Sequence, residues 1–142
     1  MWIGIAGLVS VWLAALSIYD LRQRRLPNAL TLPGAVVILL VAACTGLCVP
    51  ALAGAAALTG VYLLVHLVAP AAMGAGDVKL AIGLGGLTGC FGVEVWLLAA
   101  LAAPLLTALC GVVARLIGGA ATVPHGPSMC LATVGAVGLV FV

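Results

Sequence analysis

Apolar residues occupy the chain in six long runs, separated by short stretches that contain proline, glycine or charged residues. The runs cover residues 2–19, 30–48, 51–69, 78–92, 95–116 and 126–142. Most of them approach the roughly 20 residues that a helix needs to cross the hydrocarbon layer of a bilayer. The pattern therefore predicts an all-α polytopic membrane protein, a bundle of about six transmembrane helices that forms a single domain over residues 1–142.

Prolines mark several of the predicted helix boundaries. Pro27-Asn28 lies between the first two runs, Pro50 between the second and the third, and Pro70 follows the third. Proline has no backbone N–H and interrupts a helical hydrogen-bond ladder, so it favours the end of an element. Because Asn is favoured at helix N-termini, Pro27-Asn28 is expected to end one element and to cap the next helix.

The fourth run is shorter than most of the others and rich in glycine, at Gly83, Gly85, Gly86 and Gly89. Glycines at such spacing allow helices to approach closely in lipid. The fourth run is therefore predicted to be a packed internal helix.

Composition agrees with a membrane protein and excludes several other classes. The chain is 66% hydrophobic and only 6% charged, whereas an ordinary soluble domain has roughly 25% charged residues. The five Lys and Arg residues are too few and too scattered to form a nucleic-acid-binding surface.

The positions of the basic residues predict an orientation, because short cytoplasmic loops collect Lys and Arg. Arg22, Arg24 and Arg25 follow the first run, Lys79 lies between the third and fourth, and Arg115 ends the fifth. With six alternating spans, these three places are on the same side. The distribution predicts both termini outside, with the loops after runs one, three and five in the cytoplasm.

The chain has only three acidic residues, and two of them fall at the same depth. Asp20 ends the first run and Asp77 begins the fourth, both on the predicted cytoplasmic side, whereas Glu94 lies at the opposite end. Two neighbouring carboxyl groups are what an aspartyl protease requires, since like charges held close cannot both ionise easily and one group can act as base while the other acts as acid.

Each carboxylate also has a simpler interpretation. Asp20 alone, beside an arginine cluster, is typical of a solvated residue at the membrane interface. Asp77 alone, after a glycine-rich turn, is typical of a helix N-cap. An ionisable group at the bilayer centre costs about 2.5 to 3.5 kcal/mol on insertion scales. That two of the three acidic residues lie at the same depth therefore favours a functional pair.

Two motifs give the chain a family resemblance. Asp20-Leu21-Arg22-Gln23-Arg24-Arg25-Leu26-Pro27-Asn28 at the end of the first run and Gly74-Ala75-Gly76-Asp77-Val78-Lys79-Leu80 before the fourth resemble the type IV prepilin leader peptidases. That family consists of intramembrane aspartyl proteases with a Gly-x-Gly-Asp signature. The resemblance implies that Asp20 and Asp77 are the catalytic pair, and it implies no metal and no organic cofactor.

The resemblance also implies a reaction and its partners. The family removes a short basic leader from prepilin-like or pseudopilin precursors at the cytoplasmic face of the membrane. We therefore expect a multi-pass enzyme of the cytoplasmic membrane, whose partners are the lipid bilayer and prepilin-like membrane proteins of a type IV pilus or a protein secretion system. Many relatives carry an additional cytoplasmic domain with Cys-x-x-Cys motifs and also methylate the product. None of the five cysteines forms such a motif, so we expect peptidase activity alone.

Further motif residues are candidates for substrate binding or for an active-site loop: Gly74, Gly76, Lys79, Pro27 and Asn28. Glycines at 74 and 76 would allow unusual backbone angles beside Asp77 and the approach of an extended substrate strand, although a plain flexible loop explains either one alone. Lys79 would hold the loop or balance charge near the pair, or else extend to the interface as lysines commonly do.

Two histidines complete the candidate chemistry. Pro124-His125-Gly126-Pro127 resembles a Pro-x-Gly-Pro loop that precedes the last helix of the family and borders its active site. His66 and His125 do not have the spacing of metal ligands, so each is expected to be satisfied within the core.

Other functional classes remain open at this stage. Presenilin-like and signal-peptide-peptidase enzymes share Gly-x-Gly-Asp, but they lack the Arg-x-x-x-Leu-Pro-Asn continuation. A small proton- or ion-coupled transporter would also use intramembrane carboxylates, although it would be expected to place them along the depth of the bundle. An inactive scaffold that kept the family fold is a third alternative.

Overall fold

The chain folds into six α-helices that follow one another with short connections. The computed structural model describes residues 1–119 and 122–142, which contain no β-strand. The helices are α1 (Trp2–Gln23), α2 (Asn28–Cys44), α3 (Cys48–Val68), α4 (Ala75–Gly89), α5 (Val93–Leu116) and α6 (Gly126–Gly138), and a 3₁₀ turn at Leu139–Phe141 follows α6. Residues 120–121, in the expected break between the fifth and sixth runs, lie outside the described residues. The predicted all-α class and the number of helices are confirmed.

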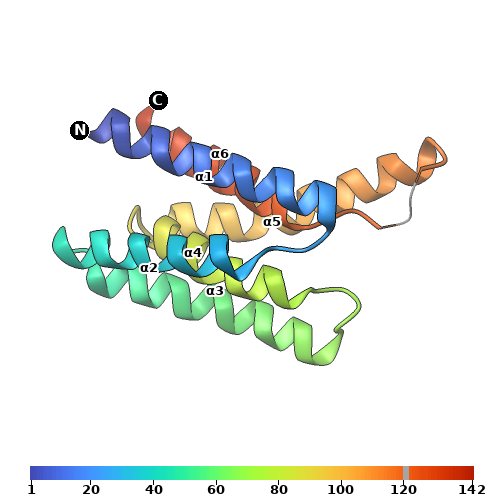
Figure 1. Ribbon diagram of the computed structural model, residues 1–142, viewed down its shortest axis with the longest axis horizontal. Helices are drawn as coiled ribbons and strands as arrows, with labels where there is room; N and C mark the ends of the chain where they lie inside the picture. The colour runs from blue at the N-terminus through green and yellow to red at the C-terminus, as the bar shows by residue number, and fades with distance from the viewer. Residues whose placement is uncertain (120–121) are drawn as a thin grey trace.

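The helices run back and forth along one axis, so that the two termini lie at the same end of the bundle (Figure 1). Three helices are long and apolar enough to cross a membrane: α1 from Ile3, α3 and α5. α2 and the segment Gly126–Phe141 are shorter apolar helices. The charged ends of α1 and α5, at Arg22 and Arg115, lie at the end of the bundle opposite the termini (Figure 1).

Some helices begin or end at residues other than the ends of the apolar runs, because local backbone geometry sets these boundaries. α1 continues past its apolar run to Gln23 and ends at Arg24, whose φ of 51° is left-handed. Pro50 was expected to separate two helices, but it lies in the first turn of α3, where a missing N–H costs no hydrogen bond. α2 ends earlier than expected, at Cys44, and Gly46 with φ of 79° then turns the chain toward α3.

α4 is the internal helix that its glycines predicted. Its residues from Leu80 to Gly89 are mostly buried, and its backbone lies directly against that of α3. A Cβ atom at Gly85 would lie 2.5 Å from the carbonyl oxygen of Gly54, and one at Gly89 would lie 2.5 Å from that of Pro50. The two helices therefore pack at a separation that only glycine permits.

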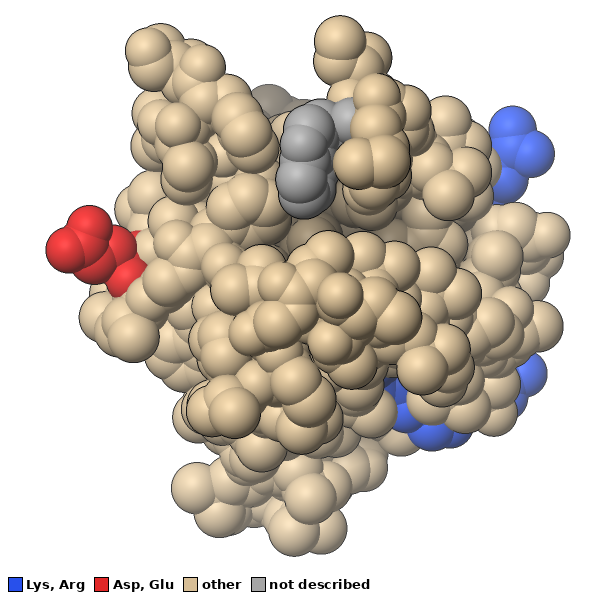
Figure 2. Space-filling view, turned by 90° about the vertical axis from the view of Figure 1, so that its left-hand side faces the viewer, with Lys and Arg blue, Asp and Glu red and all other residues tan. Residues whose placement is uncertain are grey.

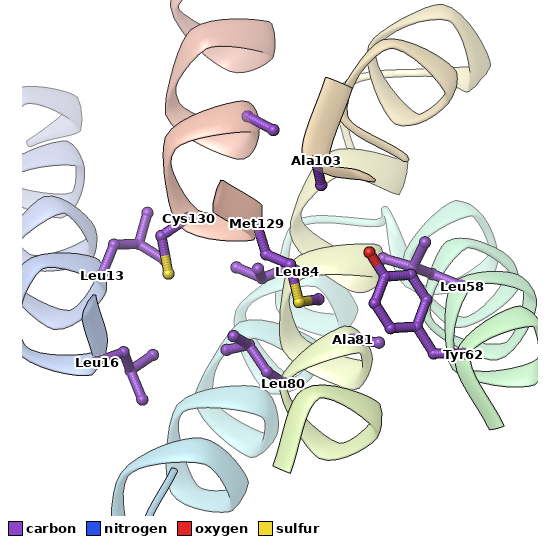
Figure 3. Close-up of a cluster of buried hydrophobic side chains, with 11 residues drawn as sticks. Leu13, Leu16, Leu58, Tyr62, Leu80, Ala81, Leu84, Ala103, Met129 and Cys130 are labelled. Carbon is purple, nitrogen blue, oxygen red and sulfur yellow. The ribbon is translucent and has the colours of Figure 1, made fainter. Parts of the chain in front are cut away.

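A cluster of buried side chains joins α4 to its neighbours (Figure 3). Leu80 and Leu84 of α4 lie at its centre and are almost fully buried, Leu16 of α1 and Met129 of α6 cover one side, and Tyr62 of α3 covers the other. Packing in lipid rests on such close contacts because no hydrophobic effect drives apolar helices together there. The cluster connects α1 to α4 through α6, which contacts both helices.

Two tryptophans add hydrogen bonds between helices. The Trp12 indole donates to the carbonyl oxygen of Leu30 at 2.9 Å, and the Trp96 indole donates to that of Gly54 at 3.0 Å. Both contacts tie the ring of one helix to the backbone of another. The end of the bundle near the termini consists almost entirely of uncharged side chains, with an acidic group at one edge and basic groups at the opposite edge (Figure 2).

All five cysteines carry free thiols, including Cys44 and Cys48, which flank the turn between α2 and α3. The fold is therefore held by packing and hydrogen bonds.

Candidate active site

Asp20 lies in the last turn of α1 and is buried, with 6% of its surface exposed. Its carboxylate Oδ2 accepts a hydrogen bond from the backbone N–H of Gly126 at 3.0 Å. Its carbonyl oxygen accepts the N–H of Arg24, which closes the helix. The interpretation of Asp20 as a solvated interface residue is therefore wrong, because α6 covers its side chain.

Asp77 is the third residue of α4, and its side chain is half-buried. The N-cap of α4 is Gly74, in extended conformation, so the interpretation of Asp77 as an N-cap is wrong. The backbone of Gly74 interacts with this carboxyl group.

Asp20 and Asp77 both line one cavity of about 610 Å³. Its walls come from the end of α1, the connection to α2, the first residue of α2 and the start of α4. The lining residues are Asp20, Gln23, Arg24, Arg25, Leu26, Pro27, Asn28, Gly74, Ala75, Gly76, Asp77 and Lys79. All seven site residues expected from the motifs therefore lie around one cavity, and Asp20 and Asp77 are close enough to interact electrostatically.

The glycines of the motif have a different role from the expected one. Gly74 has φ of −74° and ψ of 151°, which any residue adopts, and neither it nor Gly76 has a positive φ. The expected unusual backbone angles are absent because the turn into α4 is an ordinary extended N-cap. Gly76 instead permits close packing, since a Cβ atom there would lie 3.0 Å from the Cβ of Leu26.

Lys79 and Asn28 form a direct contact across the cavity wall. The Lys79 ammonium donates to the Asn28 side-chain oxygen at 2.8 Å, which joins the first turns of α4 and α2. Pro27 is the N-cap of α2, and Asn28 is its first helical residue with no side-chain cap. The expected cap by Asn28 is therefore not formed, because Pro27 occupies the N-cap position and the Asn28 side chain accepts from Lys79 instead.

The arginines after α1 were expected only to set the orientation, but two of them line the cavity. Arg24 and Arg25 belong to its wall. Arg24 also donates to the hydroxyl of Thr122 at 2.8 Å and thereby connects the end of α1 to the segment before α6. The left-handed conformation of Arg24, which the sequence does not reveal, directs the chain around the cavity.

The loop before α6 supplies the residue that contacts Asp20. Gly126 begins α6, and a Cβ atom at this position would collide with the Asp20 carboxylate. The preceding His125 is hydrogen bonded through both ring nitrogens, to Tyr62 and to Thr107, and burial lowers its pKa below the ordinary value. The Pro124–Pro127 motif was the signal for this region, and sequence reasoning missed Tyr62 and Thr107, which no motif marks.

The arrangement can perform acid and base chemistry on a polar substrate. Two carboxyl groups that interact electrostatically do not ionise together easily, so that one can be ionised while the other retains its proton. Within residues 1–119 and 122–142, no three His, Cys, Asp or Glu side chains gather as metal ligands. The site thus offers a carboxyl pair inside a cavity that also carries positive charge.

Comparison with known proteins agrees with this geometry. Residues 7–113 match the model of the type IV leader peptidase family, a stretch that includes both Asp20 and Asp77 and ends before Pro124. Searches of the curated proteins and of the solved structures gave no match. Because the match covers most of the chain and includes both aspartates around the cavity, the chain belongs to the type IV leader peptidase family, a family of membrane peptidases.

Proposed function

We propose that this protein is an intramembrane aspartyl endopeptidase. Its substrates are type IV prepilin-like or pseudopilin precursors, from which it removes the short basic leader at the cytoplasmic face of the membrane. The observation that carries this proposal is the cavity in which the carboxyl groups of Asp20 and Asp77, from two different helices, lie together.

The chemistry needs one ionised and one protonated carboxyl group. The N–H that Gly126 donates to Asp20 favours the charged form of that carboxylate. In the proposed mechanism, Asp20 therefore takes a proton from a water molecule, whose oxygen attacks the carbonyl carbon of the scissile peptide. Asp77 donates its proton to the carbonyl oxygen. The tetrahedral intermediate then collapses as Asp20 gives its proton to the leaving amine and Asp77 takes back the proton of one hydroxyl.

The surroundings support a polar peptide as the substrate. The cavity lies where α1 ends and α4 begins, at the end of the bundle that carries the basic residues. Basic residues at short connections favour the cytoplasmic side. A precursor whose hydrophobic segment lies in the bilayer would present the start of that segment, and the polar leader before it, at this depth.

The test is leader removal from a co-expressed pilin-like precursor, measured by gel shift and N-terminal sequencing. Wild type is compared with Asp20→Asn and Asp77→Asn at matched abundance, and Glu94→Gln is the control. Glu94 is the third acid and is exposed in the first turn of α5, away from the cavity. We expect cleavage by wild type and by Glu94→Gln, and none by either Asp variant, because each carboxyl group has a separate proton to move.

The same comparison of cleavage rates can also contradict the proposal. Cleavage at the wild-type rate by Asp20→Asn or by Asp77→Asn contradicts an aspartyl mechanism. Proton or ion flux in reconstituted vesicles would then be the assay to perform, since transport is the other use of intramembrane carboxylates.

A further inference from the structure

The half-buried side chain of His125 connects three helices. It lies at the N-cap of α6. Its Nε2 is 2.9 Å from the Tyr62 hydroxyl of α3, and its Nδ1 is 2.6 Å from the Thr107 hydroxyl of α5. Figure 3 shows Tyr62 extending inward from α3 with its hydroxyl toward the part of α5 that carries Ala103.

One assignment of proton directions satisfies every polar atom of this network when the imidazole is neutral. The Thr107 hydroxyl also lies 3.1 Å from the carbonyl oxygen of Ala103, which can only accept. The single hydroxyl proton of Thr107 therefore goes to Ala103, and Thr107 accepts from Nδ1–H of His125. Nε2 then lacks a proton and accepts the hydroxyl of Tyr62. This tautomer, inferred from the network, satisfies every polar atom of the three side chains.

Gly126, the next residue along the chain, connects His125 to Asp20. The His125 carbonyl accepts the N–H of Met129, the first turn of α6, and Gly126 directs its N–H at the Asp20 carboxylate. The Gly126 backbone lies so close to Asp20 that a Cβ atom at this position would collide with the carboxylate. Because Gly126 directly follows residue 125, a shift of residue 125 would displace this donor.

We propose that His125 is a positioning residue. Its imidazole, held between Tyr62 and Thr107, fixes the first turn of α6 so that the Gly126 N–H meets the Asp20 carboxylate. The inference rests on the proposed function, because its consequence is measured as peptidase activity. It concerns a part of the chain beyond the residues that match the family.

The test uses the purified full-length protein and a precursor peptide with a basic leader and a hydrophobic segment. His125→Phe keeps a planar ring but cannot hydrogen bond, and Thr107→Val removes one hydroxyl at almost constant volume. We expect both variants to lower kcat with KM unchanged, by about tenfold or more for His125→Phe, because a displacement of 1 Å at a reacting group can cost about a hundredfold. His125→Gln, whose amide can accept from Tyr62 and donate to Thr107, is expected to recover most of the rate.

A matched control and a double variant separate positioning from general packing. Thr59→Val is the same substitution at a half-buried α3 residue whose hydroxyl bonds to no described group, so its kcat is expected to equal that of wild type. Thr107→Val combined with His125→Phe is expected to be no slower than His125→Phe alone, since residues of one network are not additive.

The outcomes distinguish this inference from the proposed function. If Asp20→Asn cleaves the peptide as fast as wild type, the aspartyl mechanism fails and the role of His125 with it. If Asp20→Asn is inactive while His125→Phe or Thr107→Val has the wild-type kcat, only the inference about His125 is overturned. Equal losses in His125→Phe and His125→Gln would also overturn it, because hydrogen bonding would then play no part.

Discussion

Gly126 donates its backbone N–H to the Asp20 carboxylate at 3.0 Å, across 106 positions of sequence. This contact makes the last helix part of the carboxyl site, although its chain segment follows the two aspartate motifs by a long distance. A backbone donor needs no particular side chain, but it does need a residue small enough for the carboxylate to approach.

The first prediction tests the need for a small residue at position 126. In Gly126→Ala the new methyl group would occupy the place of the Asp20 carboxylate, so we expect α6 or Asp20 to shift and the cleavage rate to fall by about a hundredfold. The measurement is the initial rate of leader removal at matched abundance. Gly135→Ala is the control, because a Cβ atom at this other glycine of α6 would meet nothing within 4 Å. Equal rates for the two variants would contradict the prediction.

The second prediction separates two roles for Lys79. Its ammonium donates to Asn28 at 2.8 Å in an exposed position, where a hydrogen bond contributes only about 0.5 kcal/mol to stability. If Lys79 acts through this contact, Lys79→Met and Asn28→Ala should each slow cleavage by only about two- to threefold. The double variant should be no slower than either single variant, as measured by initial rates. A far larger loss for Lys79→Met alone would instead mean that Lys79 acts on Asp77 or on substrate.

The third prediction tests the close packing of α3 and α4. A Cβ atom at Gly85 would lie 2.5 Å from the carbonyl oxygen of Gly54 and 2.9 Å from the Cβ of Leu58. We expect Gly85→Ala to lower the free energy of unfolding by about 1–3 kcal/mol, the usual cost of overpacking. Thermal unfolding in detergent measures this as a melting temperature several degrees lower. Gly60→Ala on α3, where a Cβ atom would meet nothing within 4 Å, should melt like wild type, and a normal melting temperature for Gly85→Ala would refute the close contact.

Much of this fold could be predicted from the apolar runs. Each run coincides with a helix to within four residues at either end, because long uncharged segments have few alternatives to helix in a bilayer. The glycines of α4 correctly predicted an internal helix. The boundaries were less predictable: Pro50 was read as a break, but it fits the first turn of α3. The local effect of a proline depends on its position within a turn.

The candidate site was predictable only in part. The motifs indicated the seven residues that line one cavity, since their chemistry is unusual in an apolar chain. Tyr62 and Thr107 could not be found in this way, because a lone hydroxyl in an apolar helix is common and its partner is set by helix packing. The burial of Asp20 likewise depends on α6, which no local pattern near Asp20 reveals.

His125 is the titratable group that this network holds. It faces Tyr62 from α3 and Thr107 from α5, and its own backbone leads to Gly126 and Asp20. Asp77 is the ionisable group that acts on Tyr62. Burial lowers the pKa of His125 from its ordinary value near 6.5. In the unfolded chain the same side chain is solvated and takes up a proton at higher pH.

The last prediction follows from the sign of this difference. Because the unfolded state binds more protons than the folded state below about pH 6.5, the stabilisation by neutral His125 is complete above this pH and is lost as the pH falls through the pKa of the folded protein. Thermal unfolding in detergent between about pH 8 and 5 should therefore show the melting temperature of wild type falling relative to that of His125→Phe. Asp20 and Asp77 titrate in both proteins, so the difference between the two curves reports residue 125 alone. Parallel curves would mean that His125 does not need to be neutral in the folded state.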